Sequence, residues 1–179
     1  MIVSQRLTLR SFTKNDLDPF LEYRNDYQIA KYQSWDFPFS KEKASKFIDN
    51  QKEKSLDTHQ EGWMQIAIID MKTSEMIGDC AVNFFDNKKQ TEFGITIAKD
   101  FQGKGYAFEA LQLLFGYLFS EIHIHRIVGI ADFENTGSIN LMKKLGMRKE
   151  AHYYQSYYDS RIKEWRDEVL YAILNSEWK

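Results

Sequence analysis

A glycine-rich segment near the middle of the chain has the residue types and spacing of a phosphate-binding loop. It reads Gln102-Gly103-Lys104-Gly105-Tyr106-Ala107, and it stands between an alternating run at 91–97 and an apolar helical pattern that reaches Phe119. Two glycines one residue apart allow a tight turn and a close approach of the backbone to a ligand. The first N–H groups of a helix have no partner within it and lie at the positive end of its dipole, so this order of strand, loop and helix predicts a phosphate site. The alternative is a surface turn that caps an ordinary helix.

Two familiar phosphate loops do not fit this segment. A Walker loop needs Ser or Thr after its lysine, but Gly105 follows Lys104. A dinucleotide-binding fingerprint needs a third glycine near Phe108 and a place near the start of a series of βαβ units, and the sequence offers neither. A phosphate ligand of another class is therefore expected.

The length and composition of the chain suit one soluble domain. Its 179 residues suffice for one core, so a single domain spanning 1–179 is expected. The net charge of −2 gives no reason to expect nucleic acid or an anionic membrane as a partner. Cys80 is the single cysteine, which excludes an internal disulfide and a cysteine zinc cluster. Because no apolar run reaches membrane-spanning length either, the sequence predicts a cytoplasmic protein.

Hydrophobic periodicity predicts an α+β (mixed α/β) fold with a central sheet of seven strands and about four helices. Strands are expected at 4–12, 63–70, 76–85, 91–97, 126–132, 148–157 and 164–174, and helices at 14–24, at 40–54, from the glycine loop to 119, and at 135–146. The strands before the glycine loop follow one another as an antiparallel meander. The strand at 126–132 comes after a long helix and can only return in parallel beside the strand at 91–97. The sheet is therefore mixed and mostly antiparallel.

Several separated segments together resemble one known family. They are Arg6-Leu7-Thr8-Leu9-Arg10, Trp35 to Ser40, Glu92-Phe93-Gly94, Gln102 to Ala107, Asn135 with Ser138, and Lys144-Leu145-Gly146-Met147. In this order and spacing they resemble the RimJ/RimL branch of the GNAT acyltransferases over nearly the whole chain. The glycine loop matches the Q/R-x-x-G-x-G/A signature that holds the pyrophosphate of acetyl-CoA in that family. The resemblance implies a sheet splayed at its middle into a V, with acetyl-CoA entering between the strands at 91–97 and 126–132.

The resemblance also assigns cofactor-binding residues. The loop amides of Gln102, Gly103, Lys104, Gly105, Tyr106 and Ala107 would hold the pyrophosphate, and the strand backbone at Ile95, Thr96 and Ile97 would pair with the pantetheine arm. Asn135 matches the family position that bonds this arm. Asn135 is equally suited to be a plain N-cap of the next helix, and one asparagine can fill both roles.

Two residues are expected to move protons. Glu92 matches a common family glutamate and is our candidate general base, with a structural ion pair or a solvated strand face as the alternative. Glu109 is expected to order the loop instead. The family's usual acid is the tyrosine of a Leu-Tyr pair, which here reads Leu141-Met142. Ser138 is the favoured replacement; it is equally plausible as a helix-start residue, and a thiolate can also leave with help from water.

Aromatic and histidine residues outside these segments have more than one interpretation. The irregular segment 25–39 is rich in aromatic side chains that either line a binding groove or fold back onto the core. The tyrosines of the last predicted hairpin, Tyr153 to Tyr158, shape acceptor specificity, form an ordinary sheet face or make a contact in a homodimer. His123 and His125 are not accompanied by a set of acidic or cysteine residues at metal-ligand spacing, so no metal is expected.

The resemblance implies an acetyl-CoA-dependent N-acetyltransferase in which a primary amine attacks the thioester directly. The acceptor is either a protein N-terminus or a small amine such as a polyamine or an aminoglycoside. The acidic residues Asp36, Asp79 and Glu164 would suit a cationic small molecule if they face the groove. The alternative function, supported by the missing tyrosine, is a non-catalytic module that senses acyl-CoA.

Overall fold

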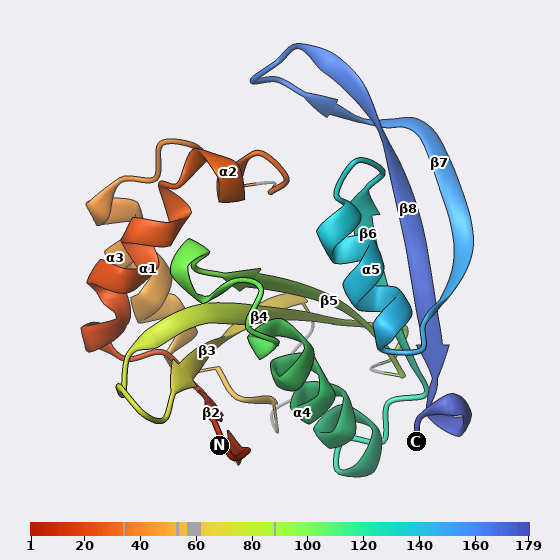
Figure 1. Ribbon diagram of the computed structural model, residues 1–179, viewed down its shortest axis with the longest axis horizontal. Helices are drawn as coiled ribbons and strands as arrows, with labels where there is room; N and C mark the ends of the chain where they lie inside the picture. The colour runs from red at the N-terminus through yellow and green to blue at the C-terminus, as the bar shows by residue number, and fades with distance from the viewer. Residues whose placement is uncertain (34, 53, 57–61, 88) are drawn as a thin grey trace.

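A single open sheet organises the molecule (Figure 1). The computed structural model describes residues 1–33, 35–52, 54–56, 62–87 and 89–179. In this part of the chain eight strands pair in the order β1-β2-β3-β4-β5-β6-β8-β7. The strands are β1 (Ile2–Val3), β2 (Leu7–Arg10), β3 (Gly62–Asp70), β4 (Met76–Phe85), β5 (Gln90–Ile97), β6 (Arg126–Asp132), β7 (Arg148–Asp159) and β8 (Glu164–Leu174). The helices are α1 (Leu17–Arg24), α2 (Tyr27–Ala30), α3 (Lys41–Gln51), α4 (Tyr106–Ser120) and α5 (Thr136–Lys144).

The mixed α/β fold expected from the sequence is confirmed, but the predicted strand count is wrong by one. Ser4 Oγ accepts hydrogen bonds from the N–H groups of Arg6 (3.2 Å) and Leu7 (2.9 Å) and so closes a turn before β2. Because of this turn, β1 folds back antiparallel to β2, with Ile2 opposite Leu9. The strand predicted at 4–12 corresponds to β2 alone, and the short strand β1 before the turn was not predicted.

The N-terminal helices also depart from the prediction in detail. The helix expected at 14–24 begins as a 3-10 turn at Lys14–Asp16 and becomes α-helical at Leu17. Pro19 lies in the first turn of α1, where an N–H would have no partner within the helix, so it does not break the helix. The short helix α2 was not predicted. Asp26 caps it by accepting a hydrogen bond from the N–H of Gln28 (2.7 Å).

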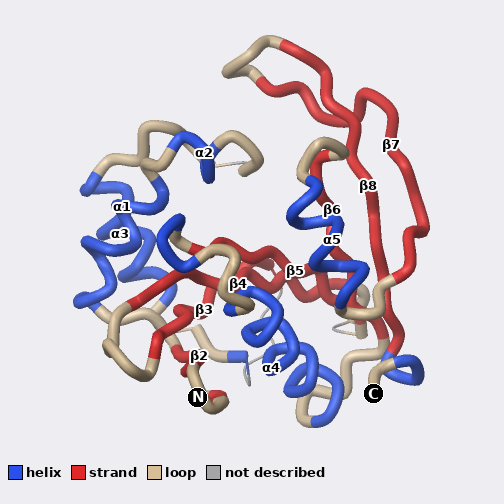
Figure 2. The backbone as a smooth tube through the Cα atoms, viewed as in Figure 1, coloured by secondary structure: helices blue, strands red, loops and turns tan. Residues whose placement is uncertain are grey.

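Strands β5 and β6 part at the middle of the sheet (Figure 2). They are parallel and pair only from Gln90 with Arg126 to Phe93 with Gly129, after which the registered pairing stops. Gly129 allows the Phe93 ring to lie at this point, because a Cβ atom on Gly129 would stand 2.5 Å from Phe93 Cε1 and 2.9 Å from Met142 Sδ. The Phe93 ring packs edge-on against Phe115 of α4, with ring centroids 5.0 Å apart. The V-shaped opening expected between these strands is therefore present.

Helices cover the sheet on both faces. The long helix α4 buries a continuous stripe against the face that carries Phe93, made by Ala110, Leu111, Leu114, Phe115, Leu118 and Phe119. Helices α1 and α3 enclose a second apolar cluster around Phe20 on the side of β3 and β4. Strands β7 and β8 extend past the rest of the sheet as a long hairpin (Figure 1). No helix in the described residues is long and apolar enough to cross a membrane.

Replacement of Gly129 by alanine tests the packing at the point where the strands part. We expect Gly129→Ala to lower the free energy of unfolding by about 1–3 kcal/mol, because the added methyl group overlaps the Phe93 ring and the Met142 sulfur. The control is Gly116→Ala inside α4, where a Cβ atom meets nothing within 4 Å and helix propensity favours alanine by roughly 0.5–1 kcal/mol. Urea denaturation of both variants measures the difference, and equal stability of the two would contradict this account.

Candidate active site

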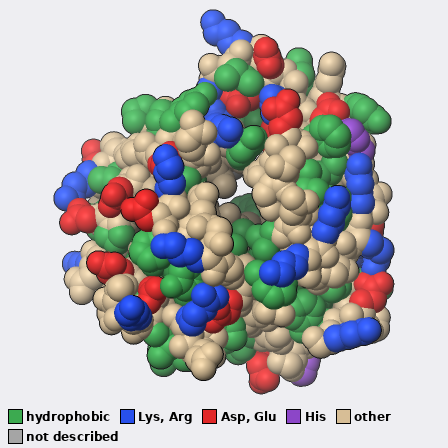
Figure 3. Space-filling model, viewed as in Figure 1, with side chains coloured by type: hydrophobic (Ala, Val, Ile, Leu, Met, Phe, Trp, Pro, Cys, Tyr) green, Lys and Arg blue, Asp and Glu red, His purple; other side chains and the backbone are tan. Residues whose placement is uncertain are grey.

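A cavity of about 420 Å³ occupies the opening between β5 and β6. It is lined by four groups of residues: the end of β5, the glycine loop with the start of α4, the end of β6 with the start of α5, and the segment of α2. We call the part with α1, α2 and α3 and the part with β6, α5, β7 and β8 the two lobes (Figure 1). Figure 3 shows the surface hollowed between them at this place. Of the residues proposed from the sequence, the wall includes Ile95, Thr96, Ile97, Gln102, Gly103, Ala107, Asn135 and Ser138.

The glycine loop presents free backbone donors. Gly103 and Gly105 have positive φ angles of 73° and 83°, the left-handed conformation that glycine adopts without strain. Within the described part of the chain, the N–H groups of residues 103–108 donate to no protein acceptor, and the first satisfied one is that of Glu109, which donates to the Gly105 carbonyl (3.1 Å). These donors point out of a helix start beside the cavity, which is the arrangement that binds phosphate groups.

Gln102 differs from the other loop residues. Its N–H donates to the Lys99 carbonyl (3.1 Å) and is therefore not available to a ligand. Its side-chain Nε2 donates to the Ile97 carbonyl (2.8 Å) and so joins the loop to the end of β5. Gln102 thus positions the loop, and the predicted set of free amides narrows to Gly103 and the residues after it.

The N-terminal segment holds the loop from the opposite side. Arg6 donates from Nη1 to the Lys104 carbonyl (3.1 Å) and from Nε to Glu109 Oε2 (2.7 Å), and Ser4 Oγ donates to Glu109 Oε1 (2.6 Å). Burial opposes ionisation of Glu109, but the hydrogen bonds from Ser4 and Arg6 outweigh it and lower the pKa of this carboxyl group. Glu109 therefore orders the loop as a charged structural group. The sequence predicted this ordering role for Glu109, whereas no role in the loop was predicted for Arg6.

Tyr106 and Lys104 direct their side chains away from the cavity wall. The Tyr106 hydroxyl donates to Asp70 Oδ2 (2.7 Å), and the Arg6 guanidinium lies 4.6 Å from the centre of the Tyr106 ring. Lys104 Nζ lies 5.5 Å from the centre of the Phe101 ring. Lys104, Gly105 and Tyr106 therefore contribute their backbone N–H groups to the site.

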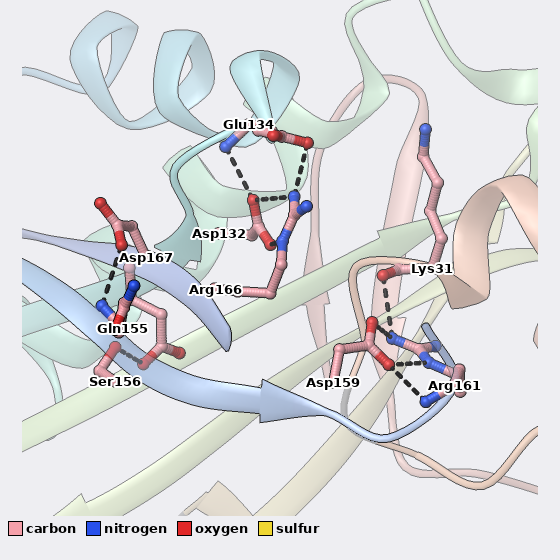
Figure 4. Close-up of polar contacts among 10 residues, drawn as sticks. Lys31, Asp132, Glu134, Gln155, Ser156, Asp159, Arg161, Arg166 and Asp167 are labelled. Carbon is pink, nitrogen blue, oxygen red and sulfur yellow. Dashed lines mark hydrogen bonds and ion pairs between the residues drawn. The ribbon is translucent and has the colours of Figure 1, made fainter. Parts of the chain in front are cut away.

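The turn between β6 and α5 brings Asn135 and Ser138 to the cavity. Asn135 Oδ1 accepts the N–H of Ser138 (3.1 Å), so Asn135 is the N-cap of α5 and its side-chain amide group still lines the wall. Arg166 of β8 fixes this turn by donating from Nε to Asp132 (3.0 Å) and from Nη2 to Glu134 (2.6 Å) (Figure 4). The side of the opening formed by β6 is thereby attached to β8 rather than to β5.

Hydroxyl groups reach the cavity from both sides. Ser138 lines it at the start of α5, and Met142, which stands at the family's tyrosine position, is buried beside Gly129 and Phe93. Tyr32 lines the cavity from the segment after α2 and was not singled out from the sequence as a proton donor. The aromatic segment 25–39 thus has both expected roles, because Trp35 packs against the core while Tyr32 faces the cavity.

Glu92 lies next to the cavity but not in its wall. Phe93 points toward α4, and because side chains alternate along a strand, Glu92 points to the opposite face of the sheet. It is half-buried, and no donor or cation among the described residues contacts its carboxylate. Burial raises the pKa of Glu92, and the neighbouring charge of Glu168 raises it further. The ion pair considered as an alternative role is absent from the described residues.

The acidic residues considered for cation binding do not line the cavity. Asp36 pairs with Lys43 (2.6 Å) at the surface, and Glu164 is exposed on the last hairpin. Asp79 is buried, where it accepts a hydrogen bond from the Tyr23 hydroxyl and lies 3.6 Å from Arg24. Among the described residues no three His, Cys, Asp or Glu side chains are placed to hold a metal ion.

Neutralising Glu168 tests the electrostatic state of Glu92. We expect Glu168→Gln to lower the pKa of Glu92 toward its ordinary value, because a like charge that disfavours the ionised form is removed. Burial still keeps the pKa above that value. Carboxyl NMR titration of Glu92 measures the change, and Glu164→Gln, an exposed change on the same strand, is the control. An unchanged pKa in Glu168→Gln would contradict the coupling.

Comparisons with known proteins identify relatives of this chain. A protein-family model described as an acetyltransferase (GNAT) domain matches residues 6–148. The uncharacterized N-acetyltransferase YnaD of Bacillus subtilis (strain 168) is 31% identical over 177 residues, which are 99% of this chain and 98% of that protein. The ribosomal protein uS5-alanine N-acetyltransferase of Escherichia coli (strain K12) is 34% identical over 116 residues, 62% of this chain and 57% of that protein. The crystal structure of a GNAT-family acetyltransferase from Bacillus anthracis has a TM-score of 0.86 at 28% identity and covers 98% of this chain and 99% of its own.

Proposed function

The chain belongs to the GNAT family of acetyltransferases and is an N-acetyltransferase, and from this premise we propose that it transfers the acetyl group of acetyl-CoA to a primary amine at the cavity between β5 and β6. One observation carries the proposal. In the described part of the chain, the unpaired N–H groups of residues 103–108 stand beside an opening where β5 has no registered partner strand beyond Phe93. A diphosphate and an extended chain attached to it match these two features together.

Different residues of the site bind different parts of the cofactor. The amides of residues 103–108 hold the pyrophosphate, and the backbone of Ile95 to Ile97 pairs with the pantetheine arm where β6 has moved away. Asn135 Oδ1 caps α5, and its side-chain nitrogen, which donates to no acceptor among the described residues, bonds the same arm. Acetyl-CoA supplies the acetyl thioester. Positioning of this group beside the acceptor amine is the main contribution of the site to the rate.

Proton transfer is assigned to residues on the two sides of the sheet. Glu92 accepts the proton of the incoming ammonium group, directly or through a water molecule, because its raised pKa and unpaired carboxylate suit a general base. The amine then attacks the thioester directly. Ser138 donates a proton to the leaving thiolate and takes up the extra proton that the attacking nitrogen carries, and Tyr32 is the second hydroxyl group placed to do so.

The acceptor we propose is a protein N-terminus, with a small amine as the second candidate. The uS5-alanine N-acetyltransferase relative, whose name states a ribosomal protein alanine as its acceptor, supports the first candidate. Release of free thiol from acetyl-CoA tests both, with peptides of defined N-termini, polyamines and an aminoglycoside as acceptors. Binding of CoA without thiol release by any acceptor would favour the acyl-CoA sensor and overturn the proposed transfer.

A substitution in the glycine loop tests the phosphate site. We expect Gly105→Val to weaken CoA binding by more than about tenfold, because a branched side chain disturbs the left-handed turn that aims the free amides. Gly146→Val is the matched control: Gly146 has a φ of 82°, the same kind of strain, but lies at the end of α5. Both changes should cost about 1–3 kcal/mol of stability. Calorimetric titration with CoA then separates them, and an equal loss of binding would contradict the assignment.

Substitution of the proposed proton-transfer residues tests the mechanism. We expect Glu92→Gln to lower kcat by about 100-fold or more, because the general base is removed, while the affinity for CoA is retained. Ser138→Ala and Tyr32→Phe identify the acid, since only the variant that lacks the true donor loses kcat strongly. Steady-state kinetics with a fixed acceptor measure all three. A change in KM for acetyl-CoA alone would show that these side chains bind substrate rather than transfer protons.

A further inference from the structure

The tip of the last hairpin contacts the opposite side of the opening. Arg161 lies in the turn between β7 and β8, and its Nη2 donates to the Lys31 carbonyl (2.9 Å) (Figure 4). Its Nη1 donates to the Ala30 carbonyl. Ala30 ends α2, which belongs with α1 and α3 on the other lobe (Figure 1). Arg161 therefore connects two segments that are 130 residues apart in the sequence.

Asp159 holds the Arg161 guanidinium in place. Its Oδ1 accepts from Arg161 Nε (2.9 Å) and from the Arg161 backbone N–H (3.0 Å), and its Oδ2 accepts from Nη2 (2.9 Å). Asp159 is 6% exposed and the Arg161 side chain is 23% exposed, so this contact is partly shielded from water. A planar guanidinium fixed by two carboxylate oxygens loses little further freedom when it binds the two carbonyl groups. We call Asp159, Arg161 and the carbonyls of Ala30 and Lys31 the clasp.

The clasp adjoins one wall of the cavity. The residues on either side of its two carbonyl groups, Ile29 and Tyr32, line the cavity together with Gln28 and Gln33. At the closed end of the V, the two lobes are joined by the pairing of β5 with β6. With the clasp they are also joined at the hairpin tip, so the opening is bounded on two sides (Figure 3).

We propose that Arg161 is a specificity-determining residue, which sets the width of the acceptor entrance by tying the segment at 30–31 to the hairpin tip. The inference rests on the proposed function. An entrance of fixed width favours an amine whose carbon bears only small substituents, as in an unbranched alkylamine or an N-terminal alanine, over an amine whose carbon is part of a ring or carries a branched side chain. Release of the clasp lets the wall formed by Ile29 to Gln33 move outward and admits the wider amines.

Two substitutions in the same turn test the clasp. Arg161→Met removes the guanidinium, and Lys163→Met removes the same charge from an exposed side chain for which the described residues show no side-chain partner. The probes are pairs that differ chiefly in width beside the amine: hexylamine with cyclohexylamine, and peptides of one length with N-terminal Ala or Val. The measured quantity is the ratio of kcat/KM for the narrow and the wide member of each pair.

We expect the wild type and Lys163→Met to prefer the narrow member, and Arg161→Met to reduce that preference by about tenfold in at least one pair. Arg161→Lys should restore part of it, since one ammonium group can still reach a carbonyl. A purely structural role would lower kcat/KM for both members alike, and thermal unfolding reports any loss of stability separately. An active wild type whose ratio is unaffected by Arg161→Met overturns the clasp alone. A wild type that acetylates no amine overturns the proposed function as well.

Discussion

The separation of β5 from β6 after Phe93 and Gly129 is the constraint on which the site depends. Two parallel strands that stayed paired would satisfy each other's backbone and leave no opening. Here the Phe93 ring takes the place that a side chain on residue 129 would need, and both strands continue on diverging paths. One strand then ends at the glycine loop and the other at the cap of α5, so both lead toward the same cavity.

Each side of this opening is fixed by its own set of charged groups. The glycine loop is held by Arg6 and Glu109, which occupy its carbonyl side and leave its amide side free. The end of β6 is held by Arg166 through two carboxylates. In both places a guanidinium binds a carboxylate at the edge of the site, so the backbone beside it keeps one position without contributing side-chain charge to the cavity.

The sequence predicts what local patterns encode. The loop at 102–107, the strand before it and the helix after it follow from glycine spacing and periodicity, and the parallel return of 126–132 follows from chain connectivity. The resemblance to RimJ/RimL-type acetyltransferases is confirmed, and the V-shaped opening was predicted from this resemblance. The hydrogen bond from the Gln102 N–H to the Lys99 carbonyl was not predicted, because it depends on backbone angles that residue types do not specify.

Contacts between segments that are distant in the sequence could not be predicted from periodicity or local motifs. Tyr32 reaches the cavity and Arg161 reaches the Ala30 carbonyl only because the two lobes fold toward each other. Neither residue lies in a motif, and both sit in irregular segments where periodicity gives no signal. The turn at Ser4 was hidden for another reason, since its neighbours continue the alternation of a strand.

The most direct test of the central claim is an amide NMR titration of the protein with CoA. The account predicts that the N–H resonances of residues 103–108 shift downfield together as CoA binds, because these donors gain phosphate acceptors that the protein does not provide. The Glu109 N–H, which already donates to the Gly105 carbonyl, should move much less. Saturable binding of CoA that leaves the resonances of residues 103–108 in place would contradict the account.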